Sequence, residues 1–492
     1  MKTNRRNFFK IAGVAGAGLF SGASLNSCSS RGKGKQADMF PAIEEAANRS
    51  HNQVSNMSGY AAPKIDTVRV GLIGLGQRGP GAVERLANIE GVEIKALCDQ
   101  KMERVEKAQK ILAAHGLTAA KPYGGNKDAW KELCQSNEID LVYICTPWQL
   151  HTPMAVFAME NGKHAASEVP AATTIDEAWQ LVETSEKTKK HCMMLENCCY
   201  DFFELLTLNM ARQGFFGELL HAEGAYIHDL RDLLFDKNGY VDMWRLKHNQ
   251  HRKGNIYPTH GLGPVCQALN INRGDKMDFL TSMSTNDFLL AAKAEDLARQ
   301  DEFYREFVTN GYRGNMNTTT IRTDKGKTIM IQHDTTSPRP YSRIHLISGT
   351  KGVACKYPEP GKISTGHEWF DEAKMKEIEE QYTPEIVKRV GEMAKKIGGH
   401  GGMDFMMDWR LIDCLRNGLP LDQNVYDAAL WSSIAPLSEW SVANRSNSIQ
   451  VPDFTCGSYK SNLPVDINLT QGGNTGVRAI TKSSDNQLTI KK

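Results

Sequence analysis

The sequence predicts an α/β protein, with a doubly wound parallel sheet in its first half and a separate sheet in its second half. Two observations predict this fold class. From residue 68 to 195, short apolar runs rich in β-branched residues alternate with stretches of helical periodicity, the pattern of a parallel sheet flanked by helices. Residues 317–323 and 328–334 alternate in polarity on either side of Asp324-Lys325-Gly326-Lys327, which predicts a β-hairpin.

The individual elements follow from these two periodicities and from the turn residues between them. Predicted strands cover residues 68–73, 92–97, 139–145, 162–170, 192–195, 225–229, 317–323, 328–334 and 341–348. Predicted helices cover residues 80–89, 102–115, 152–161, 175–188, 403–416 and 425–445, and a short helix is expected near residues 43–49.

The first strand is followed by the loop Gly74-Leu75-Gly76-Gln77-Arg78-Gly79, which opens a helix. In such a unit Gly74 makes the tight turn, Gly76 lets backbone N–H groups approach a pyrophosphate, and Gly79 lets the helix pack on the strand. The second strand leads to Asp99, 20 residues after Gly79, where a ribose hydroxyl would be bound. The sequence therefore predicts a dinucleotide site in a Rossmann domain, and the charge of Asp99 favours NAD over NADP.

The chain begins with a segment that resembles an export signal. Asn4-Arg5-Arg6-Asn7-Phe8-Phe9-Lys10 resembles the twin-arginine motif, and residues 11–23 are weakly apolar and too short for a typical membrane span. Leu25-Asn26-Ser27-Cys28 resembles a bacterial lipobox, which predicts lipid attachment at Cys28. The alternative is simple cleavage near this point, which would leave a soluble periplasmic protein. Residues 1–28 are therefore predicted to be a signal, and residues 29–63 a polar tether.

The charge of the chain argues against a nucleic-acid partner, and the spacing of its cysteines and histidines argues against a metal site. The formal net charge is +2 and no dense basic run follows residue 36, so no nucleic-acid partner is expected. The chain has 11 cysteines but no C-x-x-C pair, and its Cys and His spacing matches no metal motif, so no metal is expected. Apart from Cys28, most of the cysteines are expected to be reduced and buried.

Two histidines of the second half are candidates for proton transfer, because imidazole exchanges protons near neutral pH. His260 follows Tyr257-Pro258-Thr259 at a helix start, where a structural histidine is the alternative. His400 stands in Gly398-Gly399-His400-Gly401-Gly402, whose glycines are unfavourable in any regular element. This loop is predicted to act as a lid that carries a catalytic group, and a flexible connection is the alternative.

Further side chains of the second half are candidates for binding a sugar. Tyr226 and His228 share one face of a predicted strand, since side chains alternate along a strand. Arg245 could hold sugar hydroxyls while Trp244 stacks on a ring face, and Tyr341 is similar. Each of these residues could equally belong to the core.

The first half resembles the glucose-fructose oxidoreductase, inositol dehydrogenase and rhizopine catabolism family, whose signature is T-P-x-x-x-H, G-K-H and E-K-P. The matching residues are Thr146, Pro147 and His151, then Gly162-Lys163-His164, then Glu168-Val169-Pro170. Val169 replaces the lysine that takes the substrate hydroxyl proton in the dehydrogenases, which counts against an ordinary alcohol dehydrogenase. Ile256 to Gly261 stands where this family usually has a D-x-x-x-H or G-x-H element. The resemblance implies an open, mostly antiparallel second sheet in an α+β domain, whose C-terminal helices pack on the first domain.

Over residues 65–455 the chain further resembles glycoside hydrolase family 109. The resemblance is carried by Gln77-Arg78-Gly79, Trp148-Gln149-Leu150-His151, Glu168-Val169, Asn197, Tyr257-Pro258-Thr259-His260 and the glycine loop around His400. That family is known as α-N-acetylgalactosaminidases with tightly held NAD. Besides the glycines, the resemblance implies NAD contacts from Gln77, Arg78, Asp99, Trp148, Gln149, Leu150, His151, Glu168, Val169 and Asn197. It implies sugar contacts from Tyr226, Arg245, Tyr257, Pro258, Thr259, His260 and Tyr341, and catalytic roles for His260, His400 and Tyr226.

The implied activity is hydrolysis of terminal α-N-acetylgalactosamine on glycans. Hydride transfer from carbon 3 of the sugar to NAD, elimination, addition of water and return of the hydride form a redox-neutral cycle. Such a cycle suits an exported protein, because no NAD pool is expected outside the cytoplasmic membrane. The alternatives are a periplasmic sugar oxidoreductase with tightly bound NAD(P) and a non-catalytic, NAD-bound sugar-binding protein.

These predictions also imply how the chain is divided and where it is located. Residues 64–198 form the NAD-binding Rossmann domain, residues 199–456 the substrate-binding α+β domain, and residues 457–492 a polar tail. The expected location is the periplasmic face of a membrane, as a lipoprotein, or the periplasm. The resemblance adds a homodimer through the open sheet.

Overall fold

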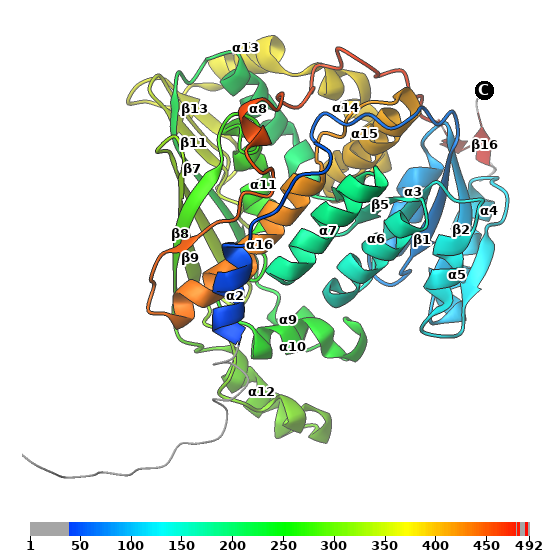
Figure 1. Cartoon of the computed structure of the whole chain (residues 1–492), viewed down its shortest axis with the longest axis horizontal. Coiled ribbons are helices and arrows are strands. Elements are labelled where there is room, and N and C mark those ends of the chain that lie inside the picture. The colour runs from blue at the N-terminus through cyan, green and yellow to red at the C-terminus, as the bar shows by residue number, and fades with distance from the viewer. Residues whose placement is uncertain (1–38, 479, 483–487, 491–492) are drawn as a thin grey trace, which may run out of the picture. The chain divides into compact units, whose positions relative to one another are not determined.

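The computed structural model describes residues 39–478, 480–482 and 488–490 (Figure 1). From residue 42 onward, the described residues form one compact unit that contains both predicted sheets. The export signal and Cys28 lie outside the described residues. Within the described part of the chain, no helix has both the length and the apolar composition needed to cross a membrane.

The first sheet is the predicted doubly wound parallel sheet. Its strands lie in the order β3-β2-β1-β4-β5-β6, and every neighbouring pair is parallel. They are β1 (Val68–Ile73), β2 (Val92–Asp99), β3 (Lys121–Gly124), β4 (Leu141–Ile144), β5 (His164–Ser167) and β6 (Cys192–Met194). The connecting helices are α3 (Gly79–Ala87), α4 (Met102–Ala114), α5 (Ala129–Gln135), α6 (His151–Glu160) and α7 (Ile175–Thr188). The strand order reverses between β1 and β4, which places a ligand crevice at the carboxyl ends of the strands.

The second sheet lies in the order β13-β12-β11-β7-β10-β9-β8-β14. Its strands are β7 (Leu219–Ile227), β8 (Met277–Ser284), β9 (Asn317–Thr323), β10 (Thr328–Asp334), β11 (Leu346–Gly349), β12 (Val353–Cys355), β13 (Lys362–Ser364) and β14 (Ile449–Gln450). The pair β7–β10 is parallel and the other pairs of this sheet are antiparallel, so the prediction of a mostly antiparallel sheet is confirmed. The hairpin β9–β10 has the predicted bounds. A separate pair is formed by β15 (Ile480–Lys482) and β16 (Leu488–Ile490).

The predicted strand over residues 341–348 is wrong in its first half. β11 begins only at Leu346, because Ile344 and His345 have φ angles of 60° and 47°, in the left-handed region that interrupts a strand. Ser342 forms an isolated bridge with Ile227 instead. Tyr341 therefore lies outside the regular strand, where it is 38% exposed.

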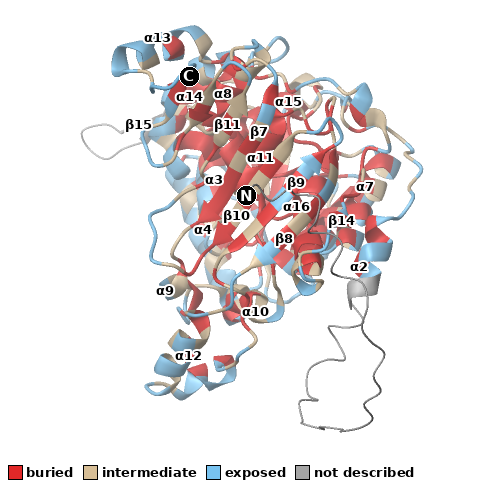
Figure 2. Cartoon of the chain, turned by 90° about the vertical axis from the view of Figure 1, so that its left-hand side faces the viewer, coloured by how far each residue is buried: buried red, intermediate tan, exposed pale blue. Residues whose placement is uncertain are grey.

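Helices of the second half connect the two sheets. α16 (Val425–Ala443) contacts both β6 and β8, α15 (Met403–Asn417) contacts α3, and α11 (Thr259–Ala268) contacts β7. α11 and α16 are almost wholly buried, whereas α13 (Glu372–Tyr382) is mostly exposed (Figure 2). The prediction that the C-terminal helices pack on the first domain is confirmed. The remaining helices are α2 (Met39–Ala47), α8 (Phe202–Arg212), α9 (Arg231–Leu234), α10 (Trp244–His251), α12 (Leu290–Ala298), α13 (Glu372–Tyr382) and α14 (Glu385–Ile397).

Two segments predicted to be a tether and a tail pack on the body of the protein. Met57 is 2% exposed, and its N–H donates to the hydroxyl of Tyr426 at 3.1 Å. In the C-terminal segment, Trp409 Nε1 donates to the carbonyl of Thr475 at 3.0 Å, and Ile467 is buried. The tether prediction is therefore wrong for residues 42–63, and residues 457–478 are a packed segment, because each buries apolar side chains.

Candidate functional site

The loop after β1 has the shape that a dinucleotide phosphate requires. Gly74 has a φ angle of +91°, and a Cβ on it would lie 2.7 Å from the carbonyl of Cys145. A Cβ on Gly79 would lie 2.1 Å from the carbonyl oxygen of Gly74, so only glycine lets α3 begin this close to the turn. A Cβ on Gly76 would meet no atom closer than 3.5 Å, so this part of the loop is open. The cradle fits a pyrophosphate at the N-terminus of α3.

Asp99, at the end of β2, fixes this loop. Its Oδ2 accepts the N–H of Leu75 at 2.8 Å, and its Oδ1 accepts the N–H of Lys101 at 2.9 Å. The guanidinium of Arg104 lies 3.5 Å from Oδ2. A carboxylate held in this way beside the glycine loop is suited to binding ribose hydroxyls.

The carboxyl ends of β4, β5 and β6 bring other predicted cofactor residues to the same edge of the sheet. Trp148, Glu168, Val169 and Asn197 are buried there. Gln77 and Gln149 are exposed, and Leu150 is half-buried.

His151 lies at the same edge, and its contact with the cofactor stays a prediction. It is buried, with Nδ1 2.7 Å from the carbonyl oxygen of Pro170 and Nε2 2.6 Å from that of Thr146. Burial lowers the pKa of His151, so the neutral ring has one N–H, which donates to one of these two carbonyl oxygens and ties His151 to the loops that border the cofactor site.

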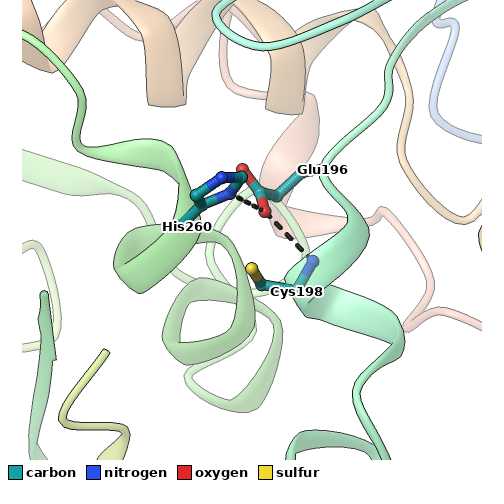
Figure 3. Close-up of side chains that lie close together, drawn as sticks. All are labelled: Glu196, Cys198 and His260. Carbon is teal, nitrogen blue, oxygen red and sulfur yellow. Dashed lines mark hydrogen bonds and ion pairs between the residues drawn. The ribbon is translucent and has the colours of Figure 1, made fainter. Parts of the chain in front are cut away.

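His260, in the first turn of α11, forms a dyad with Glu196, which follows β6 (Figure 3). Nδ1 of His260 is 2.7 Å from Oε1 of Glu196, and Nε2 is 3.3 Å from the hydroxyl of Tyr257. Burial alone would raise the pKa of Glu196, but the charge of His260 and its hydrogen bond outweigh this and lower that pKa. Glu196 is therefore a carboxylate, so Nδ1 carries the imidazole proton and Nε2 is free to accept one.

Aromatic rings surround this dyad. Tyr257 stacks on Trp148 with ring centroids 5.4 Å apart, and the ring of Tyr226 lies 4.9 Å from Tyr257 and 5.2 Å from His260. The guanidinium of Arg245 lies 4.9 Å from the centroid of Tyr257. Burial raises the pKa of both tyrosines, so they are phenols that donate hydrogen bonds at neutral pH. Flat apolar faces beside hydroxyl donors are suited to holding a sugar ring.

The remaining predicted sugar residues lie around this cluster. The ring of Tyr341 is 6.3 Å from that of Tyr226, and its hydroxyl accepts from Arg343 at 3.1 Å. Pro258 and Thr259 are buried at the start of α11, where they position His260.

The glycine loop around His400 lies beside the dinucleotide loop. Every residue from Gly398 to Gly402 has a positive φ angle, including His400 at 46°, which explains why glycines are required on either side. Nδ1 of His400 is 2.9 Å from Oδ2 of Asp404 and 3.3 Å from Nη1 of Arg78. The imidazole is 55% exposed, so the loop places an accessible histidine next to the cofactor cradle.

Asp404 connects this loop to the rest of the site. It is buried, ion-paired to Arg78 at 3.1 Å, and accepts a hydrogen bond from Asn197. Burial would raise the pKa of Asp404, but the hydrogen bond of His400 and the charges of Arg78 and Arg85 lower it. Asp404 is therefore ionised, and with His400 it forms a second histidine–carboxylate pair.

Cys198 lies close to the first dyad (Figure 3). Donor atoms of Glu196, Cys198 and His260 lie within 4.8 Å of one another, an arrangement that a metal ion could use. However, Glu196 and His260 already bind each other, and burial raises the pKa of the Cys198 thiol well above its ordinary value. Hydrogen bonding accounts for the arrangement, and the prediction of no metal stays a prediction.

Sequence reasoning missed two residues of the site, Glu196 and Asp404. Glu196 stands beside Asn197 at the carboxyl end of β6, and polar residues at that end of a parallel strand were the available signal. Asp404 lies four residues after His400, a separation that places two side chains on one side of a helical turn.

Family models match both halves of the chain. The "Oxidoreductase family, NAD-binding Rossmann fold" model matches residues 68–196, and the "Glycosyl hydrolase 109, C-terminal domain" model matches residues 200–461. Glycosyl hydrolase family 109 protein 1 of Bacteroides fragilis (strain YCH46) is 48% identical over 457 residues, covering 90% of this chain and 96% of that protein. An α-N-acetylgalactosaminidase of Bacteroides fragilis (strain ATCC 25285) is 50% identical over 418 residues, covering 82% of this chain and 96% of that protein.

Solved structures show the same fold. An NAD-binding oxidoreductase from Klebsiella pneumoniae matches with a TM-score of 0.60 at 18% identity, covering 79% of this chain and 100% of that chain. An aldose-aldose oxidoreductase from Caulobacter crescentus, complexed with glycerol, matches with a TM-score of 0.56 at 14% identity, covering 78% and 100%. At these identities the likeness concerns the fold alone.

Proposed function

Because the chain belongs to glycosyl hydrolase family 109, we propose that it removes terminal α-linked N-acetylgalactosamine from glycans, with a bound NAD that ends each cycle unchanged. The chain is a glycoside hydrolase with a nicotinamide-cofactor domain. Its 50% identity to an α-N-acetylgalactosaminidase supports the choice of sugar. The observation that carries the proposal is the place of His260, at the carboxyl ends of the dinucleotide-binding strands and among aromatic rings suited to a sugar.

The residues present fit NAD. The loop from Gly74 to Gly79 would hold its phosphates, Asp99 a ribose, and the edge formed by Trp148, Val169 and Asn197 its nicotinamide end. A bound NAD would supply reversible hydride transfer at carbon 3 of the sugar. We prefer NAD to NADP because the carboxylate of Asp99 would repel the additional phosphate of NADP.

The chain's own side chains supply binding and proton transfer. Nε2 of His260 accepts a proton, since Nδ1 is bound to Glu196, and His400 is the second acid–base group. Tyr226 and Arg245 hold sugar hydroxyls beside it. Val169, buried where related dehydrogenases have lysine, cannot exchange a proton, which disfavours ordinary alcohol oxidation.

A ketone at carbon 3 explains why proton transfer suffices to cleave the glycosidic bond. It acidifies the hydrogen on carbon 2, which leaves as a proton to a base. The electron pair of that C–H bond forms the C1–C2 double bond, and the departing oxygen keeps the electrons of the glycosidic bond and takes up a proton. Water then adds across the double bond, so no pair of flanking carboxylates is needed.

The test is the release of 4-nitrophenol from 4-nitrophenyl α-N-acetylgalactosaminide by purified full-length protein, without added NAD. We expect release with no net rise in NADH absorbance. If no phenol is released but NADH accumulates with one free sugar and is discharged by a second, the protein is a sugar oxidoreductase. If a sugar binds and neither reaction occurs, the protein is a sugar-binding protein.

We also propose that the protein is exported by the twin-arginine route and anchored by a lipid on Cys28. The twin-arginine-like and lipobox-like motifs of the first 28 residues support this proposal. Cys28→Ser should move the protein from the membrane to the soluble periplasmic fraction. A Cys28→Ser protein that stays in the membrane fraction would contradict the anchor.

A homodimer through the outer face of the second sheet is a further part of this proposal. Met283 of β8 is 67% exposed and Phe279 lies on the same face, opposite the buried Leu280. Light scattering should give twice the mass of the chain, and Met283→Lys should lower it. A monomer at micromolar concentration would contradict the dimer.

A further inference from the structure

Glu196 supplies His260 with a carboxylate from the other half of the chain. In the oxidoreductase signature the histidine usually has an aspartate four residues earlier, but that position here is Ile256, which is buried and carries no charge. The partner of His260 is instead Glu196, 64 residues earlier and at the end of β6 in the first sheet. The carboxylate that contacts His260 therefore comes from a residue that is distant in the sequence.

We propose that Glu196 is the positioning residue that directs the proton of His260 to Nδ1 and leaves Nε2 free to face the sugar. This inference rests on the proposed function, because it assigns a role within the same reaction. Glu196 itself is buried behind the imidazole and touches no substrate in this role.

The position of Glu196 is rigidly determined. Its N–H donates to Oε1 of Gln423 at 3.2 Å, and Nε2 of Gln423 donates back to its carbonyl oxygen at 2.8 Å. Its Oε1 accepts both Nδ1–H of His260 and the N–H of Cys198, the latter at 3.1 Å. The backbone and Oε1 of Glu196 are therefore held, while Oε2 has no hydrogen-bond partner among the described residues, and the imidazole is oriented through Oε1.

The orientation decides which nitrogen can work as a base. A neutral imidazole has one N–H, and when this proton points to Glu196, the lone pair of Nε2 points toward the Tyr257 hydroxyl. A sugar hydroxyl that binds beside the Tyr257 hydroxyl would give its proton to Nε2, and its oxygen would keep the electron pair of the broken O–H bond. The imidazolium then carries protons on both nitrogens, and the carboxylate of Glu196 stabilises its charge.

The matched variants are Glu196→Gln and Glu186→Gln. Glutamine keeps the shape and an acceptor oxygen but has no charge. Glu186 is equally buried and also contacts a histidine, His51 at 3.1 Å, but it binds the N-terminal segment. We expect Glu196→Gln to lower kcat on the 4-nitrophenyl substrate by about 100-fold or more, and Glu186→Gln to keep wild-type kcat. Glu196→Asp should restore part of the loss, and bound NAD per chain should not change.

Two readouts separate positioning from a merely structural role. In Glu196→Gln the acid limb of the kcat/KM profile should move to lower pH, because the imidazolium loses its stabilising charge while Arg245, Tyr226 and Tyr257 remain around it. Long-range ¹H–¹⁵N spectra of the ¹⁵N-histidine-labelled chain, with His260 assigned from His260→Asn, should show Nδ1–H in the wild type and mixed tautomers in Glu196→Gln.

The second readout does not depend on the substrate. If the wild type releases no nitrophenol but the tautomer changes as expected, the proposed function is wrong and the positioning role stands. If Glu196→Gln keeps the wild-type kcat and tautomer, or loses its NAD, the positioning role is wrong.

Discussion

Replacing Gly76 with alanine tests the dinucleotide loop without straining the chain. The new Cβ would meet nothing closer than Nη1 of Arg104, at 3.5 Å, so the cofactor-free protein should unfold at the wild-type temperature. The methyl group would occupy the part of the loop where N–H groups approach a pyrophosphate. Overpacking by one methyl group costs about 1–3 kcal/mol, which weakens NAD binding by about 5-fold to 150-fold.

The assay counts NAD per chain after purification, extensive dialysis and denaturation, and compares the Tm of stripped proteins. Gly79→Ala should lower Tm even without cofactor, because its Cβ would lie 2.1 Å from the carbonyl oxygen of Gly74. Gly366→Ala, which meets nothing within 4 Å, is the control and should match the wild type in both measurements. If Gly76→Ala retains as much NAD as the wild type, the loop is not the phosphate site.

Three further predictions address His400, His191 and the group formed by Glu196, Cys198 and His260. His400→Ala should lower kcat by about 100-fold or more and leave NAD bound. Unchanged turnover would show that the loop has no catalytic role. Burial lowers the pKa of His191 to about 4, so the unfolded chain binds this proton first and stability falls as the pH drops from about 6.5 toward 4. Urea unfolding measures the free energy of unfolding at pH 7 and at pH 5. The decrease between these pH values should be about 2 kcal/mol smaller in His191→Gln than in the wild type. An equal decrease in both proteins would contradict the assignment to His191. Dialysis against EDTA should leave activity unchanged, because His260 and Glu196 are hydrogen-bonded to each other at 2.7 Å and do not need a metal ion between them. If the purified protein holds one zinc ion per chain and loses it together with its activity, this prediction is wrong.

Local pattern was enough to predict most of the fold. The hairpin of β9 and β10 is specified by alternation and a glycine turn, and the first sheet by strand–helix alternation, both of which are properties of neighbouring residues. The strand predicted before β11 is wrong because Ile344 and His345 adopt left-handed φ angles, which a β-branched residue such as Ile344 disfavours. Such a conformation is imposed by tertiary contacts, which no local pattern records.

The candidate site was predictable where a motif fixes a residue's place, and not where a side chain's direction or a distant partner decides its role. His260 and Asn197 lie where their motifs placed them, at the edge of the first sheet. His151 lies there too, but its ring turns toward two backbone carbonyls. Glu196 becomes significant only because folding brings α11 against the end of β6, across 64 residues of sequence.

Glu196 and Asn197 are adjacent in the chain but serve different histidines. Glu196 binds His260 directly, and that imidazole is 14% exposed on a buried helix. Asn197 binds Asp404, which holds His400 on the glycine loop, where the imidazole is 55% exposed. One short segment therefore holds a nearly buried histidine directly and an exposed histidine through the buried Asp404. A glycosidase that must admit a glycan and later water needs one base in a constant position and one group that can move aside. This division agrees with the backbone, because the glycines on both sides of His400 have positive φ angles, whereas Thr259 and Gly261, which flank His260, lie in a helix.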